Sequence, residues 1–294
     1  MFKRNIFFLI ITILGIVAPL LIPIPYEIMD IWGQYIILLL PSILFVILTK
    51  ESFKEIFKLR KINLKTLVIT LVMSIAMQPL TILAASFGNM IASDQAQMLE
   101  NWMPQYSPLM GLFVIALTPA ICEEAVIRGV MLPTNSKMSI HKLALLNGFL
   151  FGIFHMNLYQ FTYTFVMAVI VTYLVIATKS ILPSVIIHFI NNGLSVLSES
   201  NTGINSFFTV LEEGPKFIQN NEIASFVYLI LMAIISFVVV RCLIKKTMKI
   251  NSYEPKSITA RSTEDETIKS KFKFKDYLPL GLSTVLFVFI SSMY

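Results

Sequence analysis

Long apolar runs separated by short polar segments make up most of this chain. Each run is continuous over about 15–20 residues, which is the length that a membrane-spanning helix needs. Barrel strands would instead alternate polar and apolar positions in segments of about ten residues. The pattern therefore predicts an all-α, polytopic transmembrane helix bundle of about eight or nine helices, with runs at 5–24, 31–49, 66–87, 109–128, 142–156, 161–178, 181–197, 223–243 and 277–293.

The polar segments between these runs suggest how the bundle is oriented. Segment 50–65 carries six basic residues among apolar residues at roughly helical spacing, which is typical of an amphipathic interfacial segment, although an ordinary basic loop would look the same. Segments 88–107 and 198–222 are acidic and are predicted to be outer loops. Because Lys and Arg mark the cytoplasmic side, the N-terminus is predicted to be cytoplasmic. The first run lacks a small-residue cleavage site and is expected to be a retained helix.

The composition supports an integral membrane protein of the cell membrane. Of the 294 residues, 56% are hydrophobic and only 14% are charged, whereas soluble domains are about one quarter charged. The formal charge of +6 lies mostly next to the apolar runs, so we expect the lipid bilayer as a partner and no nucleic acid. Cys122 and Cys242 lie in or beside apolar runs, which argues against a disulfide framework.

Ionisable residues interrupt the apolar run at 109–128, where each costs at least about 2.5–3.5 kcal/mol at the centre of a bilayer. Glu124 and Arg128 have the i, i+4 spacing and order that favour a salt bridge. Glu123 points about 100° away from Glu124 on a helix. It is therefore the carboxylate left without a partner, and we predict that it is a general base. Alternatively, both acids pair with Arg128 at the membrane surface.

Two further runs carry the same kind of polar stripe. Phe151 and His155 share a helical face, and His188 and Asn192 repeat that spacing. His188 and Asn192 can both donate hydrogen bonds to a developing oxyanion. Two structural alternatives need no catalysis. His155 could simply form a hydrogen bond within the bundle, and His188 and Asn192 could form polar contacts that hold neighbouring helices together. Two of the three histidines, His155 and His188, lie in predicted membrane helices of the central part 109–197, which favours one buried active site between these helices.

The same residues leave the question of a metal open. Glu123, His155 and His188 are a plausible three-ligand set with an open fourth position, but the chain has no His-Glu-x-x-His motif. Both a divalent metal such as zinc and a metal-free site remain compatible with the pattern. The predicted topology also places His155 at the far end of the short helix 142–156. Kinks at Pro119 and Pro183, or a tilt of the 142–156 helix, are needed to bring the three residues to one depth.

The motifs Glu123-Glu124-x-x-x-Arg128, Phe151-x-x-x-His155 and His188-x-x-x-Asn192 resemble those of the intramembrane proteases that include CAAX prenyl endopeptidases and bacteriocin-processing enzymes (the CPBP or abortive-infection family). The resemblance covers about 90 of the 294 residues, and it departs from the family at Ile127, where an aromatic residue is usual. It implies that Glu123 and His155 activate a water, that His188 and Asn192 stabilise the oxyanion, and that the site is shaped by Glu124, Arg128 and Phe151.

These observations predict an intramembrane endopeptidase that hydrolyses a membrane-associated protein or peptide. The expected divisions are N-terminal helices with a polar loop at 1–108, a catalytic membrane core at 109–197, and a C-terminal part at 198–294. One alternative is a proton-coupled transporter, which should show an internal repeat, and none is evident. Another is a non-proteolytic scaffold or bacteriocin-immunity protein with the same fold.

Overall fold

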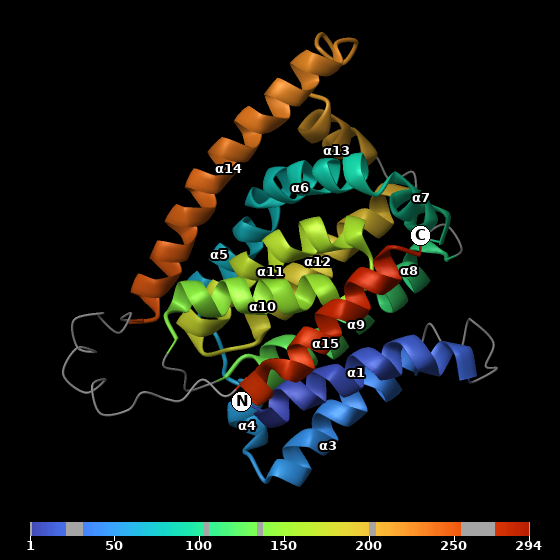
Figure 1. Ribbon diagram of the computed structural model, residues 1–294. Helices are drawn as coiled ribbons and strands as arrows, with labels where there is room; N and C mark the ends of the chain where they lie inside the picture. The colour runs from blue at the N-terminus through green and yellow to red at the C-terminus, as the bar shows by residue number, and fades with distance from the viewer. Residues whose placement is uncertain are drawn as a thin grey trace.

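The computed structural model describes residues 2–21, 32–102, 106–133, 138–199, 204–253 and 274–293, and within these ranges all regular structure is helical (Figure 1). Five helical spans among the described residues are long and apolar enough to cross a membrane: Trp32–Thr49, Leu64–Ile91, Pro108–Met131, Leu158–Thr178 and Glu222–Ile250. Two shorter apolar helices cover Ile140–Phe154 and Leu182–Ser198. The predicted all-α transmembrane bundle is confirmed, whereas the cytoplasmic N-terminus and the division of the chain into three parts remain predictions.

The N-terminal half begins with α1 (Phe2–Leu21) and a π-helix, η1 (Tyr35–Leu39), that continues into α3 (Leu40–Thr49). After the short α4 (Phe53–Ile56), one span is divided into α5 (Leu64–Ala76) and α6 (Gln78–Ile91). The division falls at Met77, two residues before Pro79 in the first turn of α6. Proline removes a backbone donor and is tolerated in a first turn, so the interruption of the span falls where the proline requires it.

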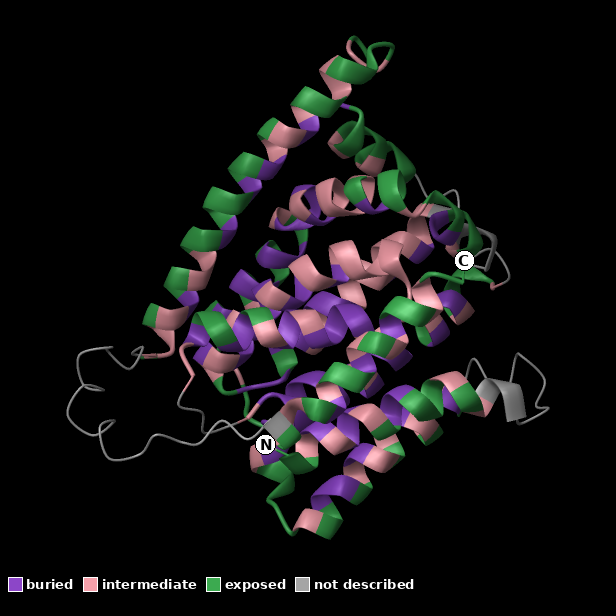
Figure 2. Ribbon diagram, in the orientation of Figure 1, coloured by how far each residue is buried: buried purple, intermediate pink, exposed green. Residues whose placement is uncertain are grey.

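The centre of the molecule is a continuous helical span with changing winding, followed by three α-helices. The span comprises α8 (Pro108–Gly111), the π-helix η3 (Leu112–Leu117), α9 (Thr118–Glu124) and the π-helix η4 (Ala125–Met131). The three helices that follow are α10 (Ile140–Phe154), α11 (Leu158–Thr178) and α12 (Leu182–Glu199). Helix α12 packs on both η3 and α9, and α10 packs on α11. Buried residues concentrate in these elements (Figure 2).

The outer helices cover this centre on two sides. Helix α14 (Glu222–Ile250) packs against α5, α6 and α11 and forms one edge of the molecule, and its outward face is apolar and exposed (Figures 1 and 2). Helix α1 lies along α15 (Phe274–Ser291), near the chain's opposite edge. Exposed apolar surface on membrane helices is what a lipid environment accommodates. The active centre is therefore expected in the inner layer rather than beneath these outer helices.

The structure places helices in two segments predicted to be loops and extends one helix beyond its predicted end. The predicted loops 88–107 and 198–222 contain helices α7 (Ser93–Trp102) and α13 (Ile204–Glu212). Helix α7 is held by long-range contacts, because the side chain of Gln95 bonds the backbone of Leu158 and Ser291. In the basic segment 50–65, only α4 and the first two residues of α5 are helical. Helix α14 continues seven residues past its predicted end at 243, with Lys249 in the last turn, where the helix dipole favours a positive charge.

Helices α10 and α11 approach each other closely because α10 has glycines on the facing side. A Cβ added at Gly148 would lie 2.6 Å from a methyl carbon of Val169, and one at Gly152 would lie 2.5 Å from the ring of Phe161. Small residues four apart commonly allow such close packing between membrane helices. This contact fixes the position of α10, whose C-terminal end reaches the centre of the bundle.

Replacement of Gly152 by alanine is expected to destabilise the protein by about 1–3 kcal/mol, because the new methyl group must displace the Phe161 ring. Thermal unfolding of the purified protein in detergent measures the effect. The matched control is Gly281→Ala on α15, where an added Cβ meets nothing within 4 Å. Equal unfolding temperatures for the two variants would contradict the close packing described above.

Candidate active site

The short length of α10 brings His155 into the interior of the bundle. Its 15 residues span about 22 Å, less than the roughly 30 Å of a hydrocarbon core. The helix ends at Phe154, with His155 as its C-cap, and Met156 turns the chain away in a left-handed conformation at φ 51°. Because α10 is too short to cross the bilayer, His155 at its end lies beside Glu123 and His188 inside the bundle.

Glu124 lies at the end of α9 with no solvent exposure. Its Oε1 accepts hydrogen bonds from Arg128 Nη1 at 2.8 Å and from His188 Nδ1 at 3.0 Å. The predicted i, i+4 salt bridge is therefore present, and it lies wholly inside the protein. Arg128 also places its guanidinium carbon 4.6 Å above the centre of the Phe151 ring, a distance at which a cation and an aromatic face attract each other.

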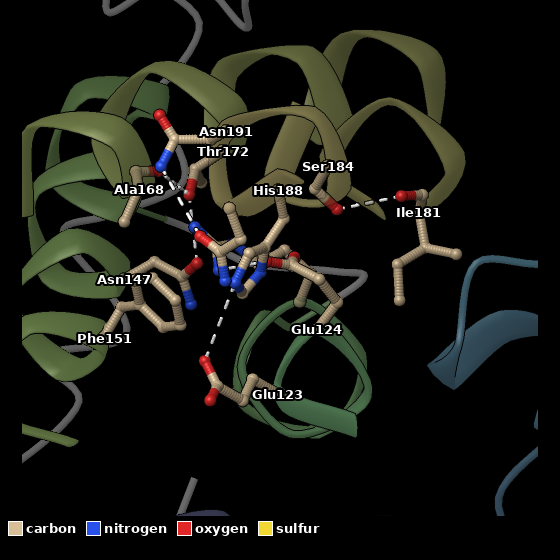
Figure 3. A network of polar contacts seen from close by, with 12 residues as sticks. Glu123, Glu124, Asn147, Phe151, Ala168, Thr172, Ile181, Ser184, His188 and Asn191 are labelled. Atoms are coloured by element: carbon tan, nitrogen blue, oxygen red, sulfur yellow. Dashed lines mark hydrogen bonds and ion pairs between the residues drawn. The ribbon is translucent and has the colours of Figure 1, made fainter. Parts of the chain in front are cut away.

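Glu123 points in another direction, toward two imidazole rings. Its Oε2 lies 3.8 Å from His155 Nε2 and 3.9 Å from His188 Nε2. Among the described residues, no hydrogen-bond donor reaches this buried oxygen. His188 therefore stands between the two carboxylates, with Glu123 on one side and Glu124 on the other (Figure 3).

In each imidazole, the partner of Nδ1 determines whether the Nε2 that faces Glu123 donates or accepts a hydrogen bond. His155 Nδ1 lies 2.8 Å from the backbone oxygen of Phe151, which can only accept, so this nitrogen carries the proton. His188 Nδ1 faces the carboxylate of Glu124, which is ion-paired with Arg128 and also accepts. In each neutral ring the Nε2 is then an acceptor. Three acceptor atoms thus converge on one place, an arrangement that calls for a hydrogen-bond donor or a cation between them.

The Phe151 ring supports this group of side chains. It stands edge to face with His155 at a centroid distance of 4.8 Å and with His188 at 5.7 Å. Together with its contact to Arg128, the ring touches three of the predicted site residues and restricts the rotation of both imidazoles. The structure therefore brings together Glu123, Glu124, Arg128, Phe151, His155 and His188.

The donor types at this place suit zinc, but their spacing does not. A carboxylate and two imidazoles whose second nitrogens are hydrogen-bonded are common zinc ligands. Two ligands of one tetrahedral zinc ion lie about 3.3 Å apart, whereas the Glu123 oxygen is 3.8 and 3.9 Å from the two nitrogens. Within the described part of the chain, no group of three His, Cys, Asp or Glu is arranged to hold a metal ion. The residues as placed do not fit a metal site.

Asn192 lies beside the cluster and is bonded to a different partner. Its Nδ2 donates to the backbone oxygen of Ile115 in η3 at 3.0 Å, and no contact joins it to Glu123 or to the imidazoles among the described residues. Its neighbour Asn191 accepts from Gln78 at 3.4 Å. One of the two N–H groups of the Asn192 amide is thus engaged in fixing η3 to α12. The role of Asn192 toward an oxyanion remains a prediction.

Two residues near the cluster were not predicted as site residues. Asn147 donates to the backbone oxygen of Ile127 at 3.0 Å and accepts from Thr172 at 3.0 Å, so it joins α10 and α11 to η4. Its place one turn before Phe151 on the same helical stripe was an available signal. Lys58 binds the end of η4, and nothing in the sequence distinguishes it from the exposed lysines around it.

Residues 105–194 match the sequence model of a family described as type II CAAX prenyl endopeptidase Rce1-like. The matched segment contains all seven predicted site residues, and its buried cluster of Glu123, Glu124 and His188 is consistent with the active-site residues of that family. The resemblance inferred from the three motifs is thereby confirmed. No curated protein and no solved structure matches the chain.

Proposed function

We propose that this protein hydrolyses a peptide bond of a membrane-associated protein or peptide with a water activated by Glu123 and His155. Its residues 105–194 match the Rce1-like type II CAAX prenyl endopeptidase family, and this match implies an intramembrane endopeptidase. The membrane setting follows from the five long apolar spans. The observation that carries the mechanism is the convergence of three acceptors, Glu123 Oε2 and the Nε2 atoms of His155 and His188.

A water between these atoms supplies the donors that the acceptors lack. It donates one hydrogen to Glu123 Oε2 and the other to His155 Nε2, which leaves an oxygen lone pair directed toward a substrate carbonyl carbon. Separations of 3.8 and 3.9 Å are too long for direct hydrogen bonds but suit a bridging water. General-base catalysis by a carboxylate positioned in this way contributes about 10²–10⁴-fold.

In the proposed reaction, the water oxygen forms a bond to the carbonyl carbon while Glu123 takes one of its protons. The carbonyl π electrons move to the oxygen, which becomes the oxyanion of a tetrahedral intermediate. Glu123 then returns the proton to the amide nitrogen as the C–N bond breaks. The products are a carboxylic acid and an amine, and the catalytic carboxylate is regenerated without a covalent intermediate.

His188 and Asn192 are the proposed donors to the oxyanion. The neutral ring accepts at Nε2, so this role requires His188 to take up a proton there before the attack; the imidazolium then donates from Nε2 while the carboxylate of Glu124 holds its Nδ1–H. Asn192 contributes the N–H that does not bind Ile115. Arg128 keeps the Glu124 carboxylate ionised and oriented toward His188 through the 2.8 Å contact. Donors fixed in a low-dielectric site stabilise developing charge much more than donors in water.

The first test is cleavage by the purified protein in lipid, with a mixed peptide library that includes prenylated C-terminal sequences. We expect hydrolysis that a metal chelator changes by less than about twofold, because the donor spacing does not fit a metal. Hydroxylamine should trap no acyl-enzyme, since the nucleophile is water rather than the neighbouring Cys122. Loss of activity on chelation with recovery on adding zinc, or a hydroxamate product, would contradict this mechanism.

A further inference from the structure

Lys58 is buried, although the sequence places it among basic interfacial residues. Only 6% of its surface is exposed. Its ammonium nitrogen lies close to four backbone oxygens, those of Arg128 at 2.6 Å, Leu132 at 2.8 Å, Ile56 at 3.2 Å and Gly129 at 3.3 Å. Three of these belong to the C-terminal end of the helical span that carries both glutamates of the site.

The last carbonyl oxygens of a helix have no partner within it, and the helix dipole makes that end negative. An ammonium group offers three hydrogen-bond donors and a positive charge. Lys58 therefore caps the end of η4 from a separate segment of the chain. Because η4 follows directly after Glu124, a shift of this end moves the carboxylates relative to the imidazoles of other helices.

The backbone of the same segment holds the beginning of α12. The carbonyl oxygen of Lys58 accepts from the N–H of Ile181 at 3.1 Å, and that of Arg60 accepts from the hydroxyl of Ser180. Lys58 has a left-handed backbone at φ 49°, a conformation that costs a non-glycine residue energy and persists where the surroundings impose it. One residue thus contacts the end of the helix with Glu123 and the start of the helix with His188.

Packing reinforces these polar contacts. Phe57 lies against Gly129 so closely that a Cβ there would come within 2.8 Å of its ring. Phe57 and Ile56 are both buried in the main hydrophobic core. Segment 56–60 is therefore fitted against η4 through the ring of Phe57 as well as through the lysine side chain, and its contact is not that of a loosely attached surface loop.

We propose that Lys58 is a positioning residue that sets the distance between Glu123 on the α9–η4 span and His188 on α12 by binding the ends of both helices. The effect on catalysis rests on the proposed function, whereas the effect on the two helix ends does not. No part of this assignment follows from the family motifs, because Lys58 lies outside the matched segment.

The charge of Lys58 gives the proposal a specific signature. Burial, with a smaller contribution from the neighbouring charge of Arg4, lowers the pKa of Lys58 to about 7, and the charge of Glu55 opposes the shift. Arg4 is paired with Glu51 and Glu55 with Arg60, and on η4 the guanidinium of Arg128 is paired with Glu124. The ammonium charge is thus present below about pH 7 and lost above it, where the neutral amine retains two donors instead of three.

Hydrogen exchange in lipid tests the positioning role without any assay of cleavage. In Lys58→Met, backbone amides in segments 125–132 and 181–185 are expected to exchange at least about tenfold faster than in the wild type. The end of η4 loses its ammonium cap, and segment 56–60, whose carbonyl oxygens hold the start of α12, is then less firmly fixed to η4. Lys54→Met removes an exposed lysine of the same segment and should leave both rates unchanged. Equal exchange in the two variants would overturn the proposal.

Cleavage adds a second readout. Lys58→Met is expected to lower kcat at least about tenfold, because small misplacements of catalytic groups have large effects on rate. Lys58→Arg keeps a permanent charge, so its activity should persist to a higher pH than that of the wild type. Superimposable pH profiles for these two proteins would show that the charge of Lys58 does not act on the site. If the wild type cleaves no peptide, the proposed function fails while hydrogen exchange still decides the role of Lys58.

Discussion

Replacement of Glu123 by glutamine is expected to lower kcat at least about 10³-fold, the scale of losing a positioned general base. Glutamine has nearly the same shape as glutamate but cannot accept the proton of the attacking water. Folding should be unaffected or slightly favoured, because the variant removes a buried carboxylate oxygen that no donor among the described residues satisfies. The measurements are kcat at saturating substrate and the unfolding temperature of the same preparation.

A matched control for this substitution is Glu213→Gln, which changes the same functional group at an exposed position and should retain full activity. His155→Ala provides a second arm, because it removes the other group that orients the water. Retention of more than about a tenth of wild-type kcat by Glu123→Gln would exclude Glu123 as the base. A large fall in unfolding temperature would instead assign Glu123 a structural role.

Replacement of Arg128 by methionine is expected to have the largest effect on stability, a loss of about 3–5 kcal/mol. The Glu124 carboxylate has no exposed surface and would remain buried without its counter-charge, which is the costly way to break a buried ion pair. The substitution also removes the guanidinium from above the Phe151 ring. Thermal or denaturant unfolding in detergent measures the loss.

The double variant Arg128→Met, Glu124→Met separates stability from activity. Because the pair is removed as a whole, much of the lost stability should return, since an apolar pair of similar volume is often as stable as a buried ion pair. Activity should not return, because His188 no longer has the carboxylate that holds its Nδ1–H. A double variant less stable than the sum of both single effects would mean that the two side chains do not act as a pair.

Each substitution removes a different contact and therefore tests a different property of the site. Glu123 contacts the reacting water in the proposed mechanism, so its substitution tests chemistry. Glu124 and Arg128 act through His188, and Lys58 acts through the helix ends, so their substitutions test how the site is held in place. The four positions come from two segments of the chain, and a shift of either segment would change the 3.8 and 3.9 Å separations around Glu123.

Sequence alone was sufficient for the features that depend on local spacing. Continuous apolar runs predict membrane helices because every backbone polar group must be satisfied within the lipid. The i, i+4 spacing of Glu124 and Arg128 places their side chains on one helical face whatever surrounds them, and the ion pair is present. The order and spacing of the three motifs likewise sufficed to predict the family, because they need no knowledge of which helices touch.

Tertiary structure decided the features that depend on contacts between distant segments. The polar stretch with α7 could not be predicted as a helix, since Gln95 is fixed by residues about 63 and 196 positions away. The tautomers of His155 and His188 follow from partners on the far side of each ring, only one of which lies on the same helix. The burial of Lys58 depends on carbonyl oxygens about 70 residues further along the chain. Sequence patterns report helical faces, whereas the partner that meets each face is determined by how the helices pack.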